Sequence, residues 1–513
     1  MLTLLHHTID GYPCQFALLE ALLEAPFPQT PNDLCQLEQR LSAAAAQVAD
    51  QIVLVQLTRA HEAEVFVTQA IAQARAQSPV PLVHQGFRTT SVLLLGGTRL
   101  VLETPSLRED RRGRRGRRRH TRGPSGAGCS PVLEALGITE RVSPATRSEV
   151  ALPVVPAASY REAAAMLARR GLVCAVSHLV RISTATAEAS IRLRDAALEA
   201  ALRVPIPHDG PLAGQRVRVR VDGGRVRTRR TRRGRKTAKG RHGFSAPWRE
   251  PRVLVIDILD EHGQPDRLRL PLYDVLIGEA EAIWALLIGY LRLLGAAYAE
   301  VVEGIADGAE WIGKRVERLR TLAEMPAAKV VEGLDCYHAS QYLSATLATC
   351  HTMPKAQRHA LYKGLRHALR HQTEGVEVVQ EAWRALATTQ RSKAILRALD
   401  SMEAHAPRMR YVTLETRKLP IGSGQVESAV RRVVNLRFKA PGSFWMEPTV
   451  NGLMHLRAAF KAGRWDEVRR GIVTGTCHTP SFEPVGTTAT LQLAAAPERE
   501  TPQTSVKPRK KAA

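Results

Sequence analysis

The sequence predicts an α/β fold built on a mixed β-sheet, and three observations carry the prediction. The run "RVRVRV", which begins at Arg216, places valines on one face and arginines on the other, as in a half-buried strand. Two more strand-like runs follow at residues 252–260 and 266–278. After a helical segment, strand-to-helix units begin at Glu300 and Lys329. Three antiparallel-type strands followed by alternating strand and helix are typical of an α/β sheet.

The segments before this sheet are helical, with one β-rich interruption. Residues 31–77 carry apolar side chains at helical spacing, and residues 86–103 predict a β-hairpin around Gly96 and Gly97. Residues 159–190 predict a helix, a turn at Gly171 and a second helix from about Ser177. This spacing fits a helix-turn-helix whose second helix enters a major groove. A helical hairpin that binds nothing fits the same spacing.

These patterns divide the chain into six regions. We expect a helical N-terminal region (1–85), a hairpin with an arginine-rich loop (86–145), a helix-turn-helix domain (146–205), a sheet domain in two parts (206–350 and 411–472), a helical insertion between those parts (351–410) and a disordered tail (473–513).

The charge of the chain predicts an anionic polymer as its partner. The 513 residues include 73 Lys and Arg against 49 Asp and Glu, a formal charge of +24. Nucleic acid is the first candidate, because the longest apolar run, from Ala282 to Leu291, is too short to span a membrane. No secretory leader is visible, and the seven cysteines form no C-x-x-C pair. We therefore expect an intracellular protein without membrane spans, disulfides or a zinc ribbon.

Two basic segments are candidates for contact with phosphate. The first, residues 111–123, holds eight arginines and no apolar side chain, so it predicts a solvated loop; a merely soluble linker is the alternative. The second follows Glu427 on a predicted helix. The candidate DNA-binding residues are Arg111, Arg112, Arg114, Arg115, Arg117, Arg118, Arg119, Arg431, Arg432, Arg437 and Lys439.

Three acids stand at places suited to a metal site. Asp222 and Asp307 each close a predicted strand, and Glu427 lies in the first turns of a helix. Each has a structural alternative: a hairpin turn at Asp222, a helix N-cap at Asp307 and an ion pair of Glu427 with Arg431. Together they favour magnesium, which binds a few carboxylates and phosphate oxygens where strand ends and a facing helix converge.

Six blocks of the sequence resemble the DDE-type insertion-sequence transposases of the ISKra group. The blocks are "VRVDGGRVR", "PWREPRVLVIDILDEHG", "EGIADGAEWIGKR", "GLDCYHASQYL", "IGSGQVESAVRRVVNLRFKAPGSFW" and "LMHLRAAFKAGRWDEV". The resemblance spans roughly residues 30 to 470 and is strongest from Val217 onward. It implies a ribonuclease H-like catalytic core that holds two Mg²⁺ or Mn²⁺ ions. Asp222, Asp307 and Glu427 match its three acids.

The resemblance also implies a function and leaves alternatives. We expect a bacterial, cytoplasmic, nucleoid-associated transposase that binds double-stranded DNA at element ends and in the target, as a homo-oligomer. A non-catalytic DNA-binding descendant and a ribonuclease H-like nuclease are the alternatives. Asp335 and His338 match a further block and are candidates for a supporting role at the metal site, although a helix cap at Asp335 with a local hydrogen bond of His338 is the more common arrangement.

Overall fold

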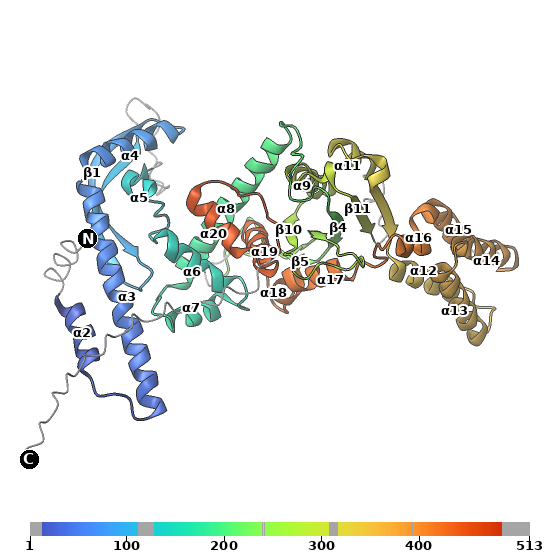
Figure 1. Cartoon of the computed structure of the whole chain (residues 1–513), viewed down its shortest axis with the longest axis horizontal. Helices are drawn as coiled ribbons and strands as arrows, with labels where there is room; N and C mark the ends of the chain where they lie inside the picture. The colour runs from blue at the N-terminus through green and yellow to red at the C-terminus, as the bar shows by residue number, and fades with distance from the viewer. Residues whose placement is uncertain are drawn as a thin grey trace, which may run out of the picture.

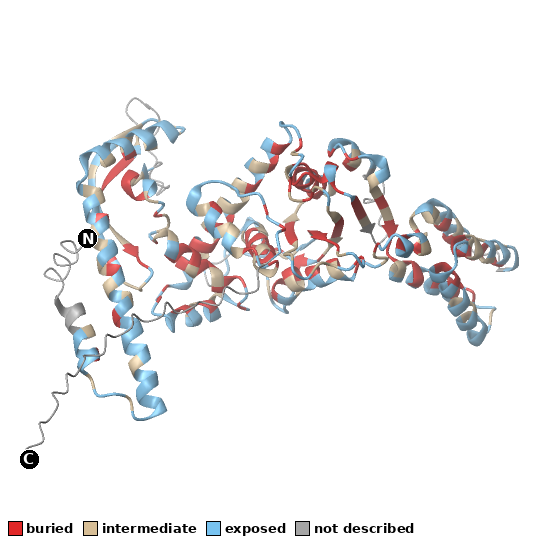
Figure 2. Cartoon of the chain, in the orientation of Figure 1, coloured by how far each residue is buried: buried red, intermediate tan, exposed pale blue. Residues whose placement is uncertain are grey.

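The chain folds into an elongated molecule with its β-sheet near the middle (Figure 1). This computed structural model describes residues 13–110, 128–238, 240, 242–306, 316–390 and 393–484. Helices and a hairpin from the N-terminal third form one end of the molecule, and helices α13–α15 form the other. Buried residues concentrate in the sheet and in the helices that cover it (Figure 2).

The N-terminal end joins long helices to a hairpin. Its helices are α2 (Pro13–Glu24), α3 (Pro31–Glu62) and α4 (Glu64–Gln77); its strands are β1 (Leu82–Leu93), β2 (Arg99–Glu109) and β3 (Gly128–Cys129). The carboxylate of Asp50 on α3 is buried and accepts hydrogen bonds from the backbone N–H groups of Gly96 (2.9 Å) and Thr98 (2.9 Å). The predicted hairpin turn is therefore tied to α3, and the hairpin is longer than residues 86–103.

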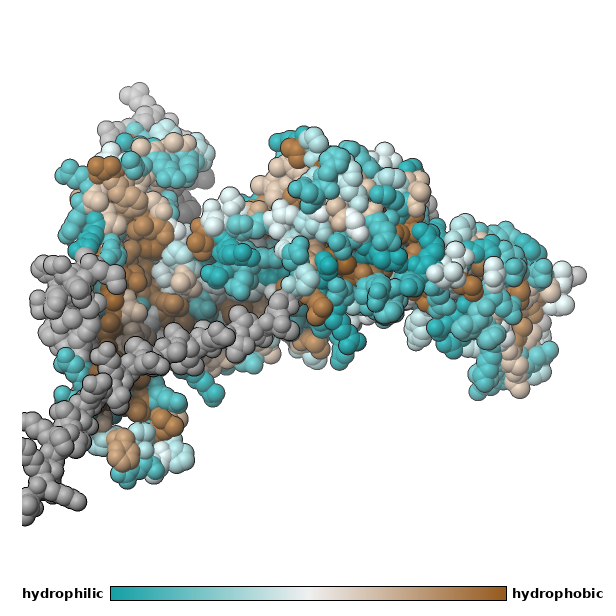
Figure 3. Space-filling model, in the orientation of Figure 1, coloured by the Kyte–Doolittle hydropathy of each residue, from teal (hydrophilic) through white to brown (hydrophobic). Residues whose placement is uncertain are grey.

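Helix α3 divides its apolar residues between two faces. Ala44 and Leu57 are buried, whereas Leu34 and Leu41 are exposed, and apolar residues gather over this end of the molecule in Figure 3. Within the described ranges, α3 is the one helix long and apolar enough to cross a membrane, a criterion that rests on length and composition only. Leu57 of α3 packs in one core cluster with Val92 and Leu100 of the hairpin, so packing accounts for part of the apolar character of α3.

A helical region connects the hairpin to the sheet. It comprises α5 (Pro131–Ala135), α6 (Pro144–Val154), α7 (Tyr160–Ala168) and α8 (Val176–Ala201). Gly171 adopts a positive φ of 78° in the turn between α7 and α8, where a side chain would be strained. The predicted pair of helices is present, with α8 starting one residue before Ser177. Docking of α8 in a DNA groove stays a prediction.

The central sheet has five strands in the order β10-β9-β4-β11-β12. Their bounds are β4 (Arg216–Gly223), β9 (Pro251–Ile258), β10 (Leu272–Ile277), β11 (Val301–Ala306) and β12 (Val330–Leu334). Strands β4, β9 and β10 pair antiparallel, whereas β11 lies parallel to both β4 and β12. This arrangement confirms the predicted α/β class with a mixed sheet. The run at residues 266–278 forms a strand only in its second half, because Asp266 closes a turn by accepting from Leu268 N–H.

Both faces of β4 are buried, which corrects the prediction of a half-buried strand. Its valines pack with α9 (Ala280–Leu293) in one core cluster. On the other face, Arg218 forms a two-pronged ion pair with Asp257 of β9, with both N···O distances 2.8 Å. Arg220 pairs with Glu303 of β11 at 3.0 Å, and neither side chain has any solvent exposure. The alternating arginines are thus interior residues whose partners come from the adjacent strands.

Helices from the second half of the chain cover both faces of the sheet and extend the molecule. They are α11 (Val316–Leu322), α12 (Cys336–Ala348), α13 (Lys355–His371), α14 (Gly375–Gln390), α15 (Lys393–His405), α16 (Tyr411–Thr416), α17 (Gly424–Val430), α18 (Leu436–Phe438), α19 (Glu447–Lys461) and α20 (Trp465–Thr474). Helices α13–α15 share a core around Trp383 with α12, α16 and strands β11 and β12. Helices α17–α19 pack over β9 and β10.

The chain beyond α20 continues to pack on the sheet. Phe482 is buried with the residues of α9, and its carbonyl accepts a hydrogen bond from Arg269 (2.9 Å). The Arg464 guanidinium lies 4.8 Å from the centre of its ring. Pro480 and Phe482, predicted as part of a disordered tail, are therefore buried, and residues 485–513 lie outside the described part of the chain.

A buried polar cluster attaches α8 to the sheet domain. Asp274 on β10 accepts from Arg194 of α8 (3.0 Å) and from the hydroxyl of Tyr290 (2.8 Å), and it lies 3.0 Å from Nδ1 of His455. Burial alone raises the pKa of this carboxyl, but the charges of Arg194 and His455 hold the pKa well below its usual range. The C-terminal half of α8 is consequently part of the sheet domain.

Candidate metal and nucleic-acid site

The carboxyl ends of three parallel neighbours, β4, β11 and β12, lie along one edge of the sheet. Asp222 is the penultimate residue of β4, and Asp335 directly follows β12. Asp307 follows β11 in the sequence but lies outside the described residues. The β4–β11 pairing has an offset of 85 (301 minus 216), the same as the separation of Asp222 and Asp307 in the sequence (307 minus 222).

Asp222 is not part of a tight hairpin. It pairs with Val253 within the sheet, and its Oδ1 accepts from the backbone N–H of Gly223 (2.6 Å). Neither Gly223 nor Gly224 has the positive φ that a two-residue hairpin turn needs. A Cβ at Gly224 would lie 3.1 Å from Val434, just beyond α17, so this glycine allows close approach between strand and helix. The hairpin-turn alternative for Asp222 is therefore wrong.

Glu427 is an exposed residue of α17, which packs against β4 and β9. Val426 of the same helix is buried in the core, and Gln425 hydrogen-bonds Asp257 of β9. The hydroxyl of Ser423 donates to Oε1 of Glu427 (3.3 Å). The structure contains no ion pair between Glu427 and Arg431, two residues that it describes fully, so the surface-pair alternative does not explain this acid.

Asp335 connects the end of β12 to the start of α17. Its side chain is 1% exposed and caps α12, accepting from the backbone N–H of His338 (2.7 Å). Its other oxygen accepts from the backbone N–H of Ser423, the residue whose hydroxyl reaches Glu427. Burial alone raises the pKa of Asp335, but the N–H groups of His338 and Ser423 hold it below its usual range.

His338 is placed by Asp335, not by a second acid. Its Nδ1 lies 3.1 Å from Oδ1 of Asp335, within the same first turn of α12. This is the local arrangement that the capping alternative predicts. Asp335 also accepts a hydrogen bond from the backbone N–H of Ser423, just before α17, and the sequence spacing did not indicate this contact.

Two buried ion pairs lie beneath the acids on the same face of the sheet. Burial raises the pKa of both Asp257 and Glu303 above their usual range, partly offset by the paired guanidinium groups of Arg218 and Arg220. These four charges are paired with one another within the sheet, whereas Asp222 and Glu427 lie at its edge. Side chains of residues 218, 220 and 222 share one face, since strand side chains alternate.

The donor set at this edge suits a hard divalent ion. Asp222 comes from a strand end and Glu427 from the helix that covers it, and carboxylate oxygens are the ligands that Mg²⁺ and Mn²⁺ prefer. Within the described residues, no three His, Cys, Asp or Glu side chains gather as a metal-binding group. Asp307, the third predicted acid, lies outside the described residues.

The basic residues after Glu427 differ in their surroundings. Arg431 and Lys439 are exposed. Arg432 donates to the hydroxyl of Tyr273 (2.7 Å) and is half-buried. Residues Arg431–Asn435 form a π-helical turn, a geometry found often at functional sites. The arginine segment from Arg111 to Arg119 lies outside the described residues.

Arg437 is a buried residue, which corrects its prediction as a DNA contact. Its side chain is 3% exposed and lies 5.7 Å and 5.8 Å from the ring centres of Phe438 and Trp445. Burial lowers the pKa of its guanidinium to about 10. A side chain enclosed in this way presents no cation to a DNA surface.

A basic stretch between β4 and β9 was not among the predicted DNA-binding segments. Residues 223–249 contain eleven Lys and Arg and no acid, a run that composition alone could have found. Its strands are β5 (Val226–Arg227), β6 (Arg230–Thr231), β7 (Phe244–Ser245) and β8 (Trp248–Arg249). Its first cation, Arg225, is three residues after Asp222.

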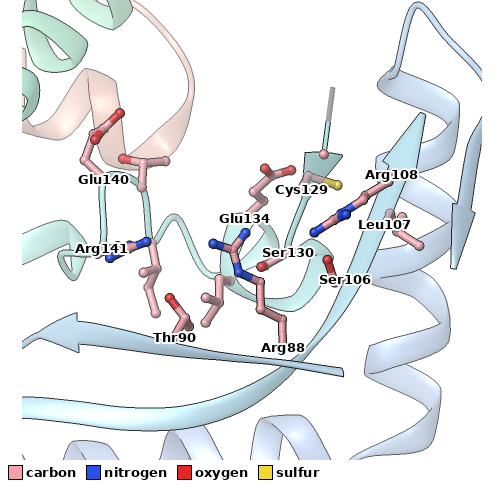
Figure 4. Close-up of a pocket in the computed structure, with 14 residues that line it drawn as sticks. Arg88, Thr90, Ser106, Leu107, Arg108, Cys129, Ser130, Glu134, Glu140 and Arg141 are labelled. Atoms are coloured by element: carbon pink, nitrogen blue, oxygen red, sulfur yellow. The ribbon is translucent and has the colours of Figure 1, made fainter. Parts of the chain in front are cut away.

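A polar cavity lies in the N-terminal region, away from the acids. Its volume is about 430 Å³, and Arg88, Arg108 and Arg141 line it together with Ser130 and Glu134 (Figure 4). Arg88 and Arg108 point from the hairpin strands towards the start of α5. Arg108 lies near the end of β2, and the arginine segment that begins at Arg111 follows β2 in the sequence. The cavity is therefore close to the point where that segment begins.

Comparison with known proteins adds no relative. No protein family matches the chain, and no curated protein matches it at a significant level.

Proposed function

We propose that this protein is a DDE-type DNA transposase of a bacterial insertion sequence. One observation carries the proposal: a five-stranded sheet with the spatial order third, second, first, fourth, fifth, in which the first three strands are antiparallel and the last two parallel. This order supports a ribonuclease H-like core. Acids follow its parallel strands, and Glu427 lies on a helix that packs over the first strand.

The residues of the chain have distinct roles in this proposal. Asp222, Asp307 and Glu427 hold two divalent ions, Mg²⁺ or Mn²⁺. Those ions supply activation of water or a 3′-hydroxyl and stabilise the charge on the attacking and leaving oxygens. The protein contributes alignment: Asp335 fixes the loop before α17, and the Ser423 hydroxyl orients one oxygen of Glu427. Alignment and electrostatics are the main terms in phosphoryl transfer.

DNA is held by cations on several elements. Arg431 lies in the π-helical turn that follows the helix of Glu427, Lys439 follows α18, and both are exposed; Arg432 is fixed next to Arg431 by Tyr273. The arginine segment from Arg111 to Arg119 adds contacts that do not depend on sequence, since phosphates are alike along a duplex. Sequence choice belongs to α8, between Ser177 and Ala189. Such an enzyme acts on the bacterial nucleoid in the cytoplasm.

Two element ends are processed together, so we propose that the active species is at least a dimer. Closed symmetry is the usual arrangement of homo-oligomers. The mass of the complex on paired ends measures this directly. A single protomer bound to two ends would contradict it.

Cleavage of labelled DNA tests the catalytic proposal. The purified full-length chain, with Mg²⁺ and the DNA that flanks its own gene, is expected to cut at the element ends. Glu427→Gln, Asp222→Asn and Asp307→Asn should abolish cutting and keep DNA binding, because each amide preserves shape and removes an anionic ligand. Glu261→Gln, a change at an exposed acid away from the sheet edge, is the matched control and should cut normally.

The same assay separates the competing functions. Normal cutting by Glu427→Gln would falsify the three-acid site. DNA binding without cutting by the unmodified chain would favour the non-catalytic descendant, and cutting of RNA-containing duplexes alone would favour a nuclease.

A further inference from the structure

The basic stretch between β4 and β9 folds as one two-stranded ribbon. Val226 pairs with Arg249 and Arg227 with Trp248; further out, Arg230 pairs with Ser245 and Thr231 with Phe244. Between them, Thr228 N–H donates to the carbonyl of Pro247 (3.0 Å). All these pairs keep one register, so residues 226–231 and 244–249 form a continuous arm about 20 Å long.

Aromatic rings make this ribbon rigid before any partner binds. The Arg227 guanidinium lies 4.8 Å from the ring centre of Trp248, its cross-strand neighbour, and Arg229 lies 4.6 Å from that of Phe244. The backbone N–H of Arg229 donates to the carbonyl of Trp445 (2.6 Å), which fixes the arm to the segment after α18. Cation–π contacts and a backbone anchor therefore hold the arm in place.

Four exposed cations of the ribbon have no acidic partner among the described residues, whereas Arg249 at its base pairs with Glu447 (2.9 Å). Arg225, Arg230, Arg232 and Arg233 are exposed, and none of them forms an ion pair with another described residue. No acid occurs between Asp222 and Glu250, so the charge of this arm is not neutralised locally. A rigid, acid-free and cationic arm is complementary to a polyanion and not to a typical protein surface.

The position of the ribbon relates it to the acids. The arm begins three residues after Asp222, and Thr231 near its outer part is nine residues from Asp222, at most about 30 Å away. At 3.4 Å per base pair, this reach covers about nine base pairs of duplex. A two-stranded ribbon is also narrow enough to enter a major groove.

We propose that this ribbon, residues 225–233 and 244–249, grips the DNA backbone next to the position of cleavage. The inference rests on the proposed function and adds to it a surface that acts on the reacting duplex. Its guanidinium groups contact phosphates, so the ribbon contributes affinity and placement but no choice of sequence. The arm and the acids then hold one stretch of DNA together.

Matched charge variants of the full-length chain test the inference. The ribbon variant carries Arg225→Gln, Arg230→Gln, Arg232→Gln and Arg233→Gln, and it retains the stacked Arg227 and Arg229. The control variant removes four exposed cations from the distant helical insertion: Lys355→Gln, Lys363→Gln, Arg366→Gln and Arg397→Gln. A third variant places lysine at the four ribbon positions. Binding to a labelled end duplex is measured between low and moderate salt.

The ribbon variant should lose the part of the salt dependence that its four contacts contribute. Each phosphate contact contributes about 0.9 to the slope of log affinity against log salt, so four contacts account for about 3.6. At 0.1 M salt each lost contact lowers affinity about eightfold. The control variant should change the slope by less than about 1. The lysine variant should have the same slope as the unmodified chain, because lysine keeps each positive charge.

Four results would contradict the inference. Equal slopes for the ribbon and control variants would overturn the ribbon, as would a lysine variant that is as weak as the glutamine variant. Absence of salt-dependent binding by the unmodified chain would overturn the proposed function and the ribbon with it. A photoreactive residue at Thr231 should crosslink within about nine base pairs of the cut, and crosslinks two helical turns away would refute the placement.

Discussion

Replacement of Asp335 by asparagine should weaken both the fold and the proposed chemistry. The two carboxylate oxygens accept from two buried backbone N–H groups, those of His338 and Ser423. Asparagine offers one oxygen and one NH₂ group, so one of the two N–H groups must lose its acceptor. A buried donor without an acceptor costs about 1–3 kcal/mol. We therefore expect Asp335→Asn to lower the free energy of unfolding by about 1–3 kcal/mol.

The functional effect should exceed the effect on stability. If the Ser423 N–H is released, the start of α17 shifts and Glu427 moves with it. A displacement of about 1 Å in a reacting group can reduce the rate about 100-fold. Ser423→Ala separates the two effects, because it keeps the backbone bond to Asp335 and removes only the hydroxyl that reaches Glu427. It should change stability by less than about 1.5 kcal/mol and still reduce cleavage.

Urea denaturation and cleavage of labelled DNA measure these effects on the same preparations. Asp33→Asn is the matched control, because Asp33 also accepts backbone N–H bonds at a helix start but is exposed. Its effect should stay below about 1 kcal/mol. An Asp335→Asn variant with unchanged unfolding free energy and normal cleavage would refute the role that we assign to Asp335.

Two further predictions concern the interior. Glu303→Gln leaves the Arg220 guanidinium buried without a counter-charge, so the free energy of unfolding in urea should fall by about 3–5 kcal/mol. The double variant Arg220→Met and Glu303→Leu should recover most of this loss. A loss below about 1 kcal/mol for Glu303→Gln alone would contradict the pairing. Asp274 has a lowered pKa in the fold, so its stabilisation is full above the unfolded pKa of about 3.9 and is lost as the pH falls. Between about pH 5 and 3, Asp274→Asn should therefore lose stability less steeply than the unmodified chain, and parallel curves would count against the cluster.

The sheet could be predicted because its signals are local. Alternation from Arg216 to Val221 identifies β4 without reference to any other segment, and the later strand-to-helix units indicate parallel strands. The burial of Arg218 and Arg220 could not be predicted in the same way. Their partners lie 39 and 83 residues further along the chain, and alternating arginines look like a solvent-facing edge until those partners are known.

Errors at the candidate site also have physical causes. Asp222-Gly223-Gly224 has the composition of a hairpin turn, but here the glycine at 224 serves close packing against Val434. Arg437 follows exposed cations in the sequence, yet the π-helical turn before it changes the helical phase, and its side chain points into the core. The link from Asp335 to Ser423 spans 88 residues, so no local spacing reveals it.

The buried pair of Arg220 and Glu303 separates what folds this domain from what reacts in it. The pair fixes the alignment of β4 with β11 from inside the sheet, whereas Asp222 is half-buried and Glu427 is exposed at its edge. Loss of an edge acid by mutation would therefore leave the fold and its cationic surfaces intact. Under the proposed function, copies of the gene that had lost cleavage would still encode a stable protein able to occupy the same DNA. Inactive descendants of such an enzyme could then persist as competitors of the active copies, and selection could act on them as regulators.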